Sequence, residues 1–319
     1  MQENRPTVLV LKGGPDAERE VSLLSGSAVA DALRETGRFN VHDRTIDRPA
    51  IDDLRATVDS ITAADADCPP VIFPVLHGHW GEGGPLQELL EQLGLPYVGS
   101  RPGPAARAMD KLLTKMLIGA ESIPTPPARQ LMPEDECDLD PPLVLKPVDD
   151  GSSVDMRICH TSDQVAQGRR ELHSKRGRLM AERYIRGREL TVGILSGRAL
   201  PLIEIVPASD AVFYDYAAKY ERDDTRYLID PDVPAGIGEK CSAWAVAVFN
   251  RLGCRDLARV DFMLDEAGPW FLEINTMPGF TGHSLVPMAA GHIGMDMPAL
   301  CTHLVEAALA RTAPPVPSA

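Results

Sequence analysis

The sequence predicts a mixed α/β protein with a parallel sheet near its N-terminus and antiparallel strands further along. Strand-like and helix-like segments alternate over residues 7–98, an order that builds a parallel sheet. From residue 143 onwards, short apolar segments are separated by turn signals such as Arg186-Gly187 and Ser196-Gly197, which favours antiparallel pairing. The length of 319 residues suits two or three compact units.

The first units each combine a strand, a loop and a helix. Thr7 to Leu11 is a run of β-forming residues that ends at Gly13-Gly14, and apolar residues recur at helical spacing from Glu18 to Leu33. The pattern returns as an expected strand at 71–76, a glycine-rich loop at 77–84, a helix at 85–93 and a strand at 95–98. Both loops should lie at the carboxyl ends of their strands, where parallel sheets bind ligands.

The rest of the chain begins after a proline-rich boundary at 102–104. A helix is expected at 105–118, with an apolar side formed by Met109, Leu112, Leu113 and Met116. We expect strands at 143–146, 179–185, 190–195 and 200–206, a helix at 239–252, strands at 257–264 and 270–274, and a closing helix that reaches about residue 311. The proline-rich end, 312–319, should be disordered.

Composition restricts the partners and the surroundings of the protein. The net charge of −14 and the pI near 5.0 argue against nucleic acids and anionic membranes, whose phosphates require a basic face. The six cysteines form no Cys-x-x-Cys pair, which favours reduced thiols over a zinc site. Because we see no signal peptide and no apolar stretch of ~18 residues, we expect a cytoplasmic protein without membrane insertion.

The most informative part of the sequence is an expected hairpin. Its strands are residues 258–264 and 270–275, and its turn is residues 265–268. Residues two apart share a face of a strand. A hairpin symmetric about Ala267 would place Asp261 opposite Glu273 and Arg259 opposite Asn275. Two opposed carboxylates repel, and oxygen ligands suit Mg²⁺, so a magnesium site is one interpretation. The other is a solvated polar face on which Arg259 neutralises both acids.

Two loops beside expected strands carry groups that bind anions. Pro278-Gly279 and residues 281–284 follow the hairpin and offer backbone N–H groups and a hydroxyl. The strand at 143–146 ends in Lys146 and leads into Gly151-Ser-Ser153, which suits the phosphates of a nucleotide. Neither the P-loop pattern nor the dinucleotide-binding glycine pattern is present. Taken singly, an ordinary turn explains each loop.

Eight motifs occur in order along the chain: Lys12-Gly-Gly-Pro-Asp-Ala-Glu18-Arg-Glu-Val-Ser, His77-Gly-x-x-Gly-Glu82, Met109-Asp-Lys111, Lys146-Pro with Gly151-Ser-Ser153, Glu182 with Gly187-Arg-Glu189, Phe213-Tyr-Asp-Tyr-Ala-Ala-Lys219-Tyr220, Arg259-Val-Asp261-Phe and Glu273-Ile-Asn275-Thr-x-Pro-Gly279. Together they closely resemble the D-alanine–D-alanine ligases of the ATP-grasp fold over about residues 7–309, and their shared order is far more specific than any one motif. The resemblance implies a three-domain ATP-grasp fold, with an N-terminal substrate-binding domain, a central domain and a C-terminal catalytic domain at 1–102, 103–187 and 188–319. A nucleotide would lie between the last two.

The resemblance also implies roles for individual residues. The ATP site would contain Lys111 and Lys146 at the phosphates, Glu182 at adenine, Glu189 at the ribose, and Tyr184. Two Mg²⁺, with Mn²⁺ as an alternative, would be held by Asp261, Glu273 and Asn275. The first of two D-alanine molecules would be anchored through its ammonium group by Glu18, near His77, with Glu18 in a hydrogen-bonded triad with Ser152 and Tyr220. The second would be bound by Lys219, Ser284 and Leu285. The tetrahedral intermediate would be stabilised by Arg259 and the Gly279 N–H. A homodimer that supplies peptidoglycan precursors is implied as well.

Three positions depart from the family's pattern: Gly83 replaces an acidic residue, Asp155 a glycine and Phe280 a methionine. These departures bear on substrate preference, so a related ligase that uses D-lactate or D-serine, or that makes a specialised metabolite, remains an alternative. A non-catalytic nucleotide-binding protein is another. Its sign would be the loss of Arg259 or of the expected metal ligands, and all of these are present.

Overall fold

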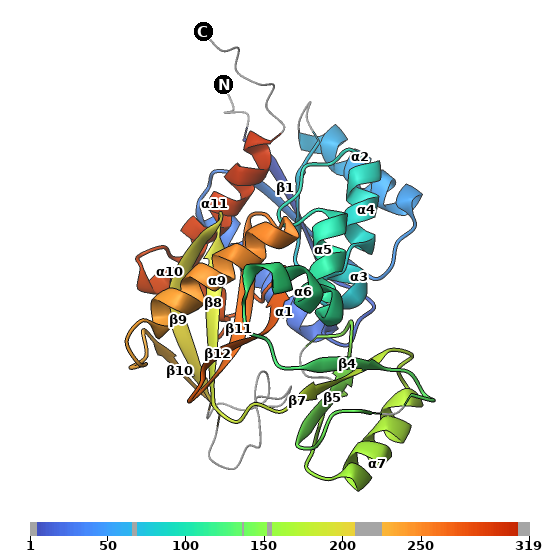
Figure 1. Ribbon diagram of the computed structural model, residues 1–319. Helices are drawn as coiled ribbons and strands as arrows, with labels where there is room; N and C mark the ends of the chain where they lie inside the picture. Colours follow the sequence, from blue (N-terminus) through green and yellow to red (C-terminus); the bar gives the residue numbers. More distant parts are fainter. Residues whose placement is uncertain (1–4, 66–68, 136, 152–154, 208–224, 312–319) are drawn as a thin grey trace.

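The structure, a computed structural model, describes residues 5–65, 69–135, 137–151, 155–207 and 225–311. Within these ranges the strands form three sheets, of three, four and five strands (Figure 1). Ser152, Lys219, Tyr220 and the end of the chain, 312–319, lie outside the described residues. In the described part, no helix is both long enough and apolar enough to cross a membrane.

The N-terminal sheet is parallel, as predicted, with its strands in the order β2-β1-β3. The strands are β1 (Thr7–Gly13), β2 (Asn40–Ile46) and β3 (Val71–Pro74). The accompanying helices are α1 (Arg19–Glu35), α2 (Ile51–Asp65), α3 (Gly78–Glu82) and α4 (Pro85–Gln92). In Figure 1, β1 lies in the upper part of the molecule, with α2 and α4 to its right.

The predictions for this sheet are confirmed for β1, α1, β3 and α4. We did not predict β2 and α2, because β2 has no fully buried residue and therefore shows no alternation of buried and exposed positions. The strand expected at 95–98 is wrong: only an isolated parallel bridge joins Ile72 to Tyr97. The loop expected at 77–84 contains the short helix α3.

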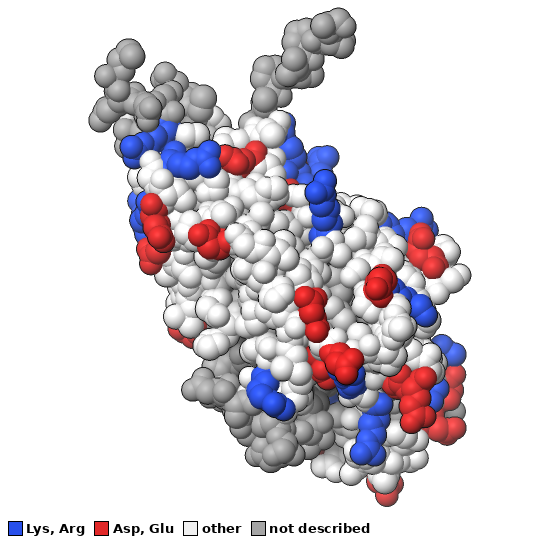
Figure 2. Space-filling model, turned by 90° about the vertical axis from the view of Figure 1, so that its left-hand side faces the viewer, with Lys and Arg blue, Asp and Glu red and all other residues white. Residues whose placement is uncertain are grey.

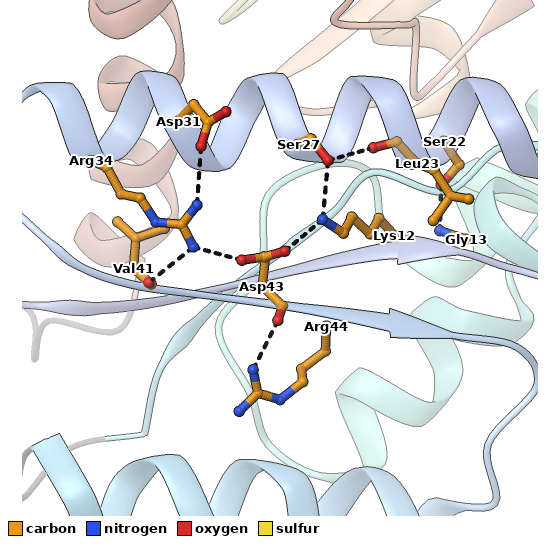
Figure 3. A network of polar contacts seen from close by, with 10 residues as sticks. All are labelled: Lys12, Gly13, Ser22, Leu23, Ser27, Asp31, Arg34, Val41, Asp43 and Arg44. Carbon is orange, nitrogen blue, oxygen red and sulfur yellow. Dashed lines mark hydrogen bonds and ion pairs between the residues drawn. The ribbon is translucent and has the colours of Figure 1, made fainter.

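A polar network fastens β2 to β1 and α1 (Figure 3). The Lys12 ammonium group at the end of β1 donates to Asp43 on β2 at 2.5 Å and to Ser27 on α1 at 3.0 Å. Arg34 of α1 also donates to Asp43, at 2.5 Å. Hydrogen bonds from Lys12 and then Arg34 hold the pKa of the Asp43 carboxyl below its usual value. The first residue of the Lys12 motif therefore has a structural role in the sheet.

The single helix expected at 105–118 is wrong, since two helices lie there, α5 (Pro102–Met109) and α6 (Lys111–Ile118). Asp110 separates them because its backbone is extended and its carboxylate accepts a hydrogen bond from the Leu113 N–H at 2.9 Å, which caps α6. A 3₁₀ turn, Gly119–Glu121, follows.

The apolar side expected for that helix is also wrong. Met116 is 77% exposed, whereas the buried side of α6 contains Lys111, Thr114, Lys115 and Ile118. The two lysines are four residues apart and so project from one face of the helix. Both amines are paired with carboxylates, which explains how a buried face contains them.

The four-stranded sheet has the order β4-β7-β5-β6, and its pairs are antiparallel. Its elements are β4 (Ala128–Leu131), β5 (Leu143–Pro147), β6 (Arg157–Cys159), α7 (Ser162–His173) and β7 (Leu179–Arg183). Leu145 of β5 and Leu172 of α7 belong to the same apolar core. This sheet and α7 form the lobe at the lower right of Figure 1.

The five-stranded sheet has the order β10-β9-β8-β11-β12 and is antiparallel throughout. Its elements are β8 (Arg188–Leu195), β9 (Arg198–Val206), β10 (Arg226–Ile229), α9 (Ile237–Leu252), β11 (Leu257–Asp265) and β12 (Gly268–Asn275). The closing helix is two helices, α10 (Leu285–His292) and α11 (Met297–Ala310). Gly294, at φ 86°, lies between them, and Asp296 caps α11.

The N-terminal sheet and the C-terminal helices share one apolar core, which holds the loops after β1, β3 and β12 close together. Phe73 of β3 and Phe280, after β12, are fully buried and meet edge to face, with ring centroids 5.5 Å apart. Leu304 of α11 lies in the same core. Each buried phenylalanine contributes about 1.5–3 kcal/mol through the removal of apolar surface from water.

On the surface shown in Figure 2, acidic and basic side chains are interspersed between broad uncharged areas.

Candidate functional site

A cavity of about 360 Å³ is lined by residues of the four-stranded and five-stranded sheets. Lys146 of β5 and Glu182 of β7 line it from one sheet, and Glu189 of β8 and Asp261 of β11 from the other. Apolar side chains complete the wall, among them Val144, Met156, Ile158, Ile185, Ile205, Met263 and Leu272. Predominantly apolar walls with a few convergent polar groups, at this volume, are typical of a site for a small molecule.

The predicted hairpin register is confirmed at the site: Asp261 lies opposite Glu273 and Arg259 opposite Asn275. The symmetry used to predict it is wrong near the turn, where Asp265 faces Gly268. A β-bulge restores the register, because Asp261 pairs with Glu273 whereas the next residue, Phe262, pairs with Phe271.

The extra residue of this bulge is Leu272, and both Leu272 and Glu273 line the cavity. Phe262 and Phe271 lie on the other face, where they meet edge to face at 6.2 Å between centroids. The bulge therefore turns the carboxylate of Glu273 towards the cavity while Phe271 stays in the core.

The two opposed carboxylates have different cationic partners. The guanidinium of Arg259 pairs with Asp261 through two hydrogen bonds of 2.9 and 2.8 Å, and Thr191 donates to the same carboxylate at 2.6 Å. The Lys111 ammonium group lies 3.3 Å from a Glu273 oxygen. Asp261 is 4% exposed, so its charge requires these partners.

The oxygen donors of the hairpin fit a magnesium ion that binds nucleotide phosphates. Such an ion needs only one or two carboxylates, because phosphate oxygens and water complete its octahedral shell. Asp261, Glu273 and Asn275 offer two carboxylates and one amide on adjacent strands. Within the described residues, no group of three or more histidine, cysteine or acidic side chains is placed to hold a metal without a ligand's help.

Two lysines predicted to bind phosphates, Lys111 and Lys146, both line the cavity. The Lys146 ammonium group lies 2.9 Å from one oxygen of Glu182, and that of Lys115 lies 2.6 Å from the other. Burial lowers the pKa of Lys146, but Glu182 and Glu273 outweigh burial and raise it above its usual value. Burial raises the pKa of Glu182, but Lys146 and Lys115 bring it below its usual value. The contact of Lys115 with Glu182 was not predicted. The sequence indicates it only through the spacing of four residues from Lys111, which places both lysines on one face of α6.

Glu182, Tyr184 and Glu189 all line the same cavity, as expected for a nucleotide-binding set. We did not predict a further pair in its wall, Arg188 and Glu204. The guanidinium of Arg188 donates to both oxygens of Glu204, at 2.7 and 2.6 Å. Arg188 is part of the Gly187-Arg-Glu189 motif, so its signal was present, whereas Glu204 is recognisable only through the pairing of β8 with β9.

A second cavity, of about 50 Å³, adjoins the first and shares Lys111, Asp150, Gly151 and Glu273 with it. Its other lining residues include the predicted site residues Glu18, His77, Arg259, Asn275 and Gly279. The N-terminal loops and the end of β12 therefore meet, as the resemblance implies.

His77 and Glu82 hold the backbone of Met277 in this second cavity. His77 Nδ1 lies 3.0 Å from the Met277 carbonyl oxygen, and Glu82 accepts hydrogen bonds from the N–H groups of Gly78 at 3.1 Å and Met277 at 3.2 Å. Burial lowers the pKa of His77 despite the nearby Glu18. Burial, and then repulsion by Glu18, raises the pKa of Glu82 to about 8. The positioning contact of Glu82 was not predicted.

The residues after β12 are placed by close contacts. A Cβ on Gly279 would lie 2.8 Å from Ser284 Oγ, so the backbone can approach this hydroxyl only at a glycine. Ser284 Oγ accepts a hydrogen bond from the Thr281 N–H at 2.8 Å and does not line either cavity. The Leu285 side chain is 5% exposed and lies in the core, so only its backbone is available to a ligand.

The chain is similar to known proteins over most of its length. Models for the "D-ala D-ala ligase N-terminus" and the "D-ala D-ala ligase C-terminus" match residues 43–100 and 126–306. D-alanine–D-alanine ligases of Gluconobacter oxydans (strain 621H) and Synechococcus sp. (strain JA-3-3Ab) are 40% and 41% identical to it, over 95% and 96% of this chain and 99% and 94% of theirs.

Solved structures of D-alanine–D-alanine ligases have a fold similar to that of this chain. That of the Bacillus anthracis ligase complexed with ATP has a TM-score of 0.81 at 30% identity, covering 97% of this chain and 98% of that one. That of the Coxiella burnetii ligase has a TM-score of 0.80 at 26% identity, covering 97% and 95%. The predicted ATP-grasp fold is confirmed by these likenesses. The chain belongs to the D-alanine–D-alanine ligase family.

Proposed function

We propose that this protein joins two D-alanine molecules into D-alanyl-D-alanine, with conversion of ATP to ADP and phosphate. The observation that carries the proposal is the junction of two cavities of different character. The larger has apolar walls and two lysines, and the smaller is lined mainly by polar side chains. They share Lys111, Asp150, Gly151 and Glu273, so a phosphoryl group held at the junction could reach a carboxylate in the smaller cavity.

The larger cavity would bind ATP. Lys111 and Lys146 would meet its phosphates, Glu182 and Tyr184 would lie by the adenine, and Glu189 by the ribose. Asp261, Glu273 and Asn275 would hold Mg²⁺, two ions as the family resemblance implies. When bound, the metal neutralises charge on the phosphates during transfer of the γ-phosphoryl group. All of these residues except Asn275 line the larger cavity, and Asn275 lines the smaller cavity that adjoins it, which supports the assignment.

The smaller cavity would bind the first D-alanine. Glu18 is 7% exposed there, and a Cβ on Gly151 would lie 2.9 Å from one of its oxygens. A buried carboxylate suits an ammonium group as partner. The D-alanine carboxylate would then face the junction, where it attacks the γ-phosphorus and forms an acyl phosphate while ADP leaves.

The amine of the second D-alanine would attack the acyl carbon. Arg259 and the Gly279 N–H line the smaller cavity and would stabilise the oxyanion that develops. Phosphate then leaves as the peptide bond forms. Ser284 and the backbone at Leu285 would bind the second carboxylate together with Lys219, and Ser152 and Tyr220 would complete the triad with Glu18. These last roles rest on the family resemblance.

We also propose a domain division, a cellular location and an oligomeric state. We keep 1–102, 103–187 and 188–319 as three domains, because the strands of each range belong to one sheet. A cytoplasmic location is supported by the proposed use of ATP. The homodimer is supported by the family resemblance, and light scattering of the purified protein tests it.

The decisive experiment is an ATP-hydrolysis screen over D- and L-amino acids with detection of products by mass. We expect ADP release that depends on D-alanine and a product of the mass of the D-alanyl dipeptide. D-Lactate and D-serine, each supplied with D-alanine, test the related activities. ATP binding without any amino-acid-dependent ADP release would instead support a non-catalytic nucleotide-binding protein.

A further inference from the structure

Three charged groups form a row at the wall of the larger cavity: Lys115 of α6, Glu182 of β7 and Lys146 of β5. Glu182 is 2% exposed and Lys115 8% exposed. One carboxylate oxygen of Glu182 lies 2.6 Å from the Lys115 ammonium group, and the other lies 2.9 Å from that of Lys146. In the antiparallel pair β5 and β7, Glu182 lies opposite Val144, so Lys146 is its diagonal neighbour on the same face.

Lys115 differs from the other two in its access to the cavity. Lys146 and Glu182 line the larger cavity, and Lys115 lines neither cavity. Its ammonium group instead donates to Thr125 Oγ1, which in turn donates to the carbonyl oxygen of Phe271 on β12 at 3.0 Å. Lys115 therefore pairs with Glu182 in the cavity wall and connects it to α6 and, through Thr125, to the hairpin.

The net charge of the row determines how Lys115 affects the binding of phosphate by Lys146. With both lysines present, one carboxylate is shared between two cations, and the row retains a net positive charge beside the cavity. Without Lys115, Glu182 and Lys146 would form a one-to-one buried ion pair with no net charge. An anionic phosphate would then have to separate this pair before it could bind Lys146, and separating buried opposite charges is costly.

We propose that Lys115 is a positioning residue for the nucleotide: it shares the charge of Glu182 and thereby keeps Lys146 able to bind phosphate. The inference rests on the proposed binding of ATP in the larger cavity. Lys115 reaches the cavity wall through its ion pair with Glu182 and does not line the smaller cavity, so its effect should fall on ATP more than on the amino acids.

The test is substitution of Lys115 by methionine, which keeps the length of the side chain and removes its charge. We expect the KM for ATP to rise about tenfold or more, the KM for D-alanine to change less than twofold at saturating ATP, and the melting temperature without nucleotide to fall only slightly. Lys240→Met, at an exposed lysine of α9, is the matched control and should leave all three values unchanged. A rise in both KM values to the same extent would overturn the proposal.

A double-variant cycle separates positioning from a merely structural role. Because Lys115 acts through Glu182, Lys115→Met should raise the KM for ATP in the wild type and add nothing in a Glu182→Gln background. Equal effects in both backgrounds would overturn the proposal.

Lys115→Gln provides a second variant that keeps a hydrogen bond to Glu182 without the charge, and it should show the same ATP-specific effect. If neither substitution gives a folded protein, the lysine is needed for the fold and the proposal fails. Wild-type protein that shows no D-alanine-dependent ADP release would refute the proposed function instead.

Discussion

Replacing Glu82 by glutamine should change how stability depends on pH. Glu82 is 5% exposed and accepts two backbone hydrogen bonds, one from Gly78 at 3.1 Å and one from Met277 at 3.2 Å. A glutamine side chain has one acceptor oxygen, so one of these two hydrogen bonds would be lost. The Met277 N–H also donates to Asn275 Oδ1 at 2.8 Å and would keep that partner. The loss of one hydrogen bond costs about 0.5–1.5 kcal/mol. At low pH the variant should therefore be less stable than wild type by about this amount.

The difference should shrink and then reverse as the pH rises. Because burial and the charge of Glu18 raise the pKa of Glu82 from 4.5 to about 8, the folded protein binds this proton more tightly than the unfolded chain. The stability that protonated Glu82 contributes is complete below the unfolded pKa and is lost as the pH rises towards the folded pKa. A shift of this size corresponds to about 5 kcal/mol at most, larger than the lost hydrogen bond. Arg259, which lowers the pKa of Glu82, is present in both proteins.

The measurement is urea unfolding of the wild type and of Glu82→Gln at intervals between pH 5 and 9. We expect the wild type to be more stable near pH 5 and the variant to be at least equally stable near pH 9. Other titrating groups, such as His77, are common to both and largely cancel in the difference. Glu91→Gln is a control on α4, because the pKa of Glu91 is lowered through its contacts with Tyr97 and Arg101, which outweigh the effect of burial. A difference between wild type and Glu82→Gln that stays constant over this range would refute the reasoning.

The remaining predictions concern the nucleotide, the metal and the second substrate. Glu273→Gln should reduce turnover at least a hundredfold while the melting temperature stays within a few degrees, because a charged oxygen ligand is lost; near-normal ADP release from the folded variant would contradict the metal assignment. Lys146→Ala should raise the KM for ATP and abolish stabilisation by ATP in thermal melting; an unchanged melting shift would exclude a phosphate role. The family resemblance implies phenylalanine at the position of Tyr220 in ligases that accept D-lactate. Tyr220→Phe should therefore gain formation of the D-alanyl-D-lactate product below neutral pH, measured by mass spectrometry with equal D-alanine and D-lactate from pH 6 to 9. An unmoved product ratio would show that Tyr220 does not select the second substrate.

The sequence predicted the elements with strong periodicity and the site residues that belong to motifs. The pairing of Asp261 with Glu273 was predicted, although the bulge at Leu272 that produces it was not. A bulge leaves no mark in residue types, because its extra residue is an ordinary leucine. The break at Asp110 was also missed, since Met109 and Leu112 continue a helical pattern across it. Its signal was an aspartate three residues before Leu113, the spacing of a helix cap.

Residues that act through other residues were the hardest to predict. Lys115 lies beside the cavity and Glu204 lines it, because α6 and β9 bring them next to Glu182 and Arg188. Strand pairing and helix docking create these contacts between residues that are far apart in the sequence. Local composition therefore cannot show them.

The three departures from the family pattern are explained by local packing. A side chain on Gly83 would place its Cβ 2.4 Å from the His79 carbonyl oxygen, so the backbone here requires glycine. Asp155 has a left-handed backbone, at φ 54°, which is the reason that glycine suits its position. Its carboxylate pairs with Arg176 at 2.8 Å and Lys175 at 3.4 Å. Phe280 is fully buried against Phe73.

None of these three residues lines either cavity, so their side chains do not meet a ligand held there. Burial raises the pKa of the Asp155 carboxyl, but Arg176 and Lys175 outweigh burial and bring it below its usual value. The negative charge added at position 155 is thus neutralised locally and does not repel phosphate in the larger cavity. The family resemblance implies phenylalanine at the position of Tyr220 in ligases that accept D-lactate. The comparison of Tyr220 with phenylalanine is therefore a more direct test of substrate choice than restoring the family's residue at 83, 155 or 280.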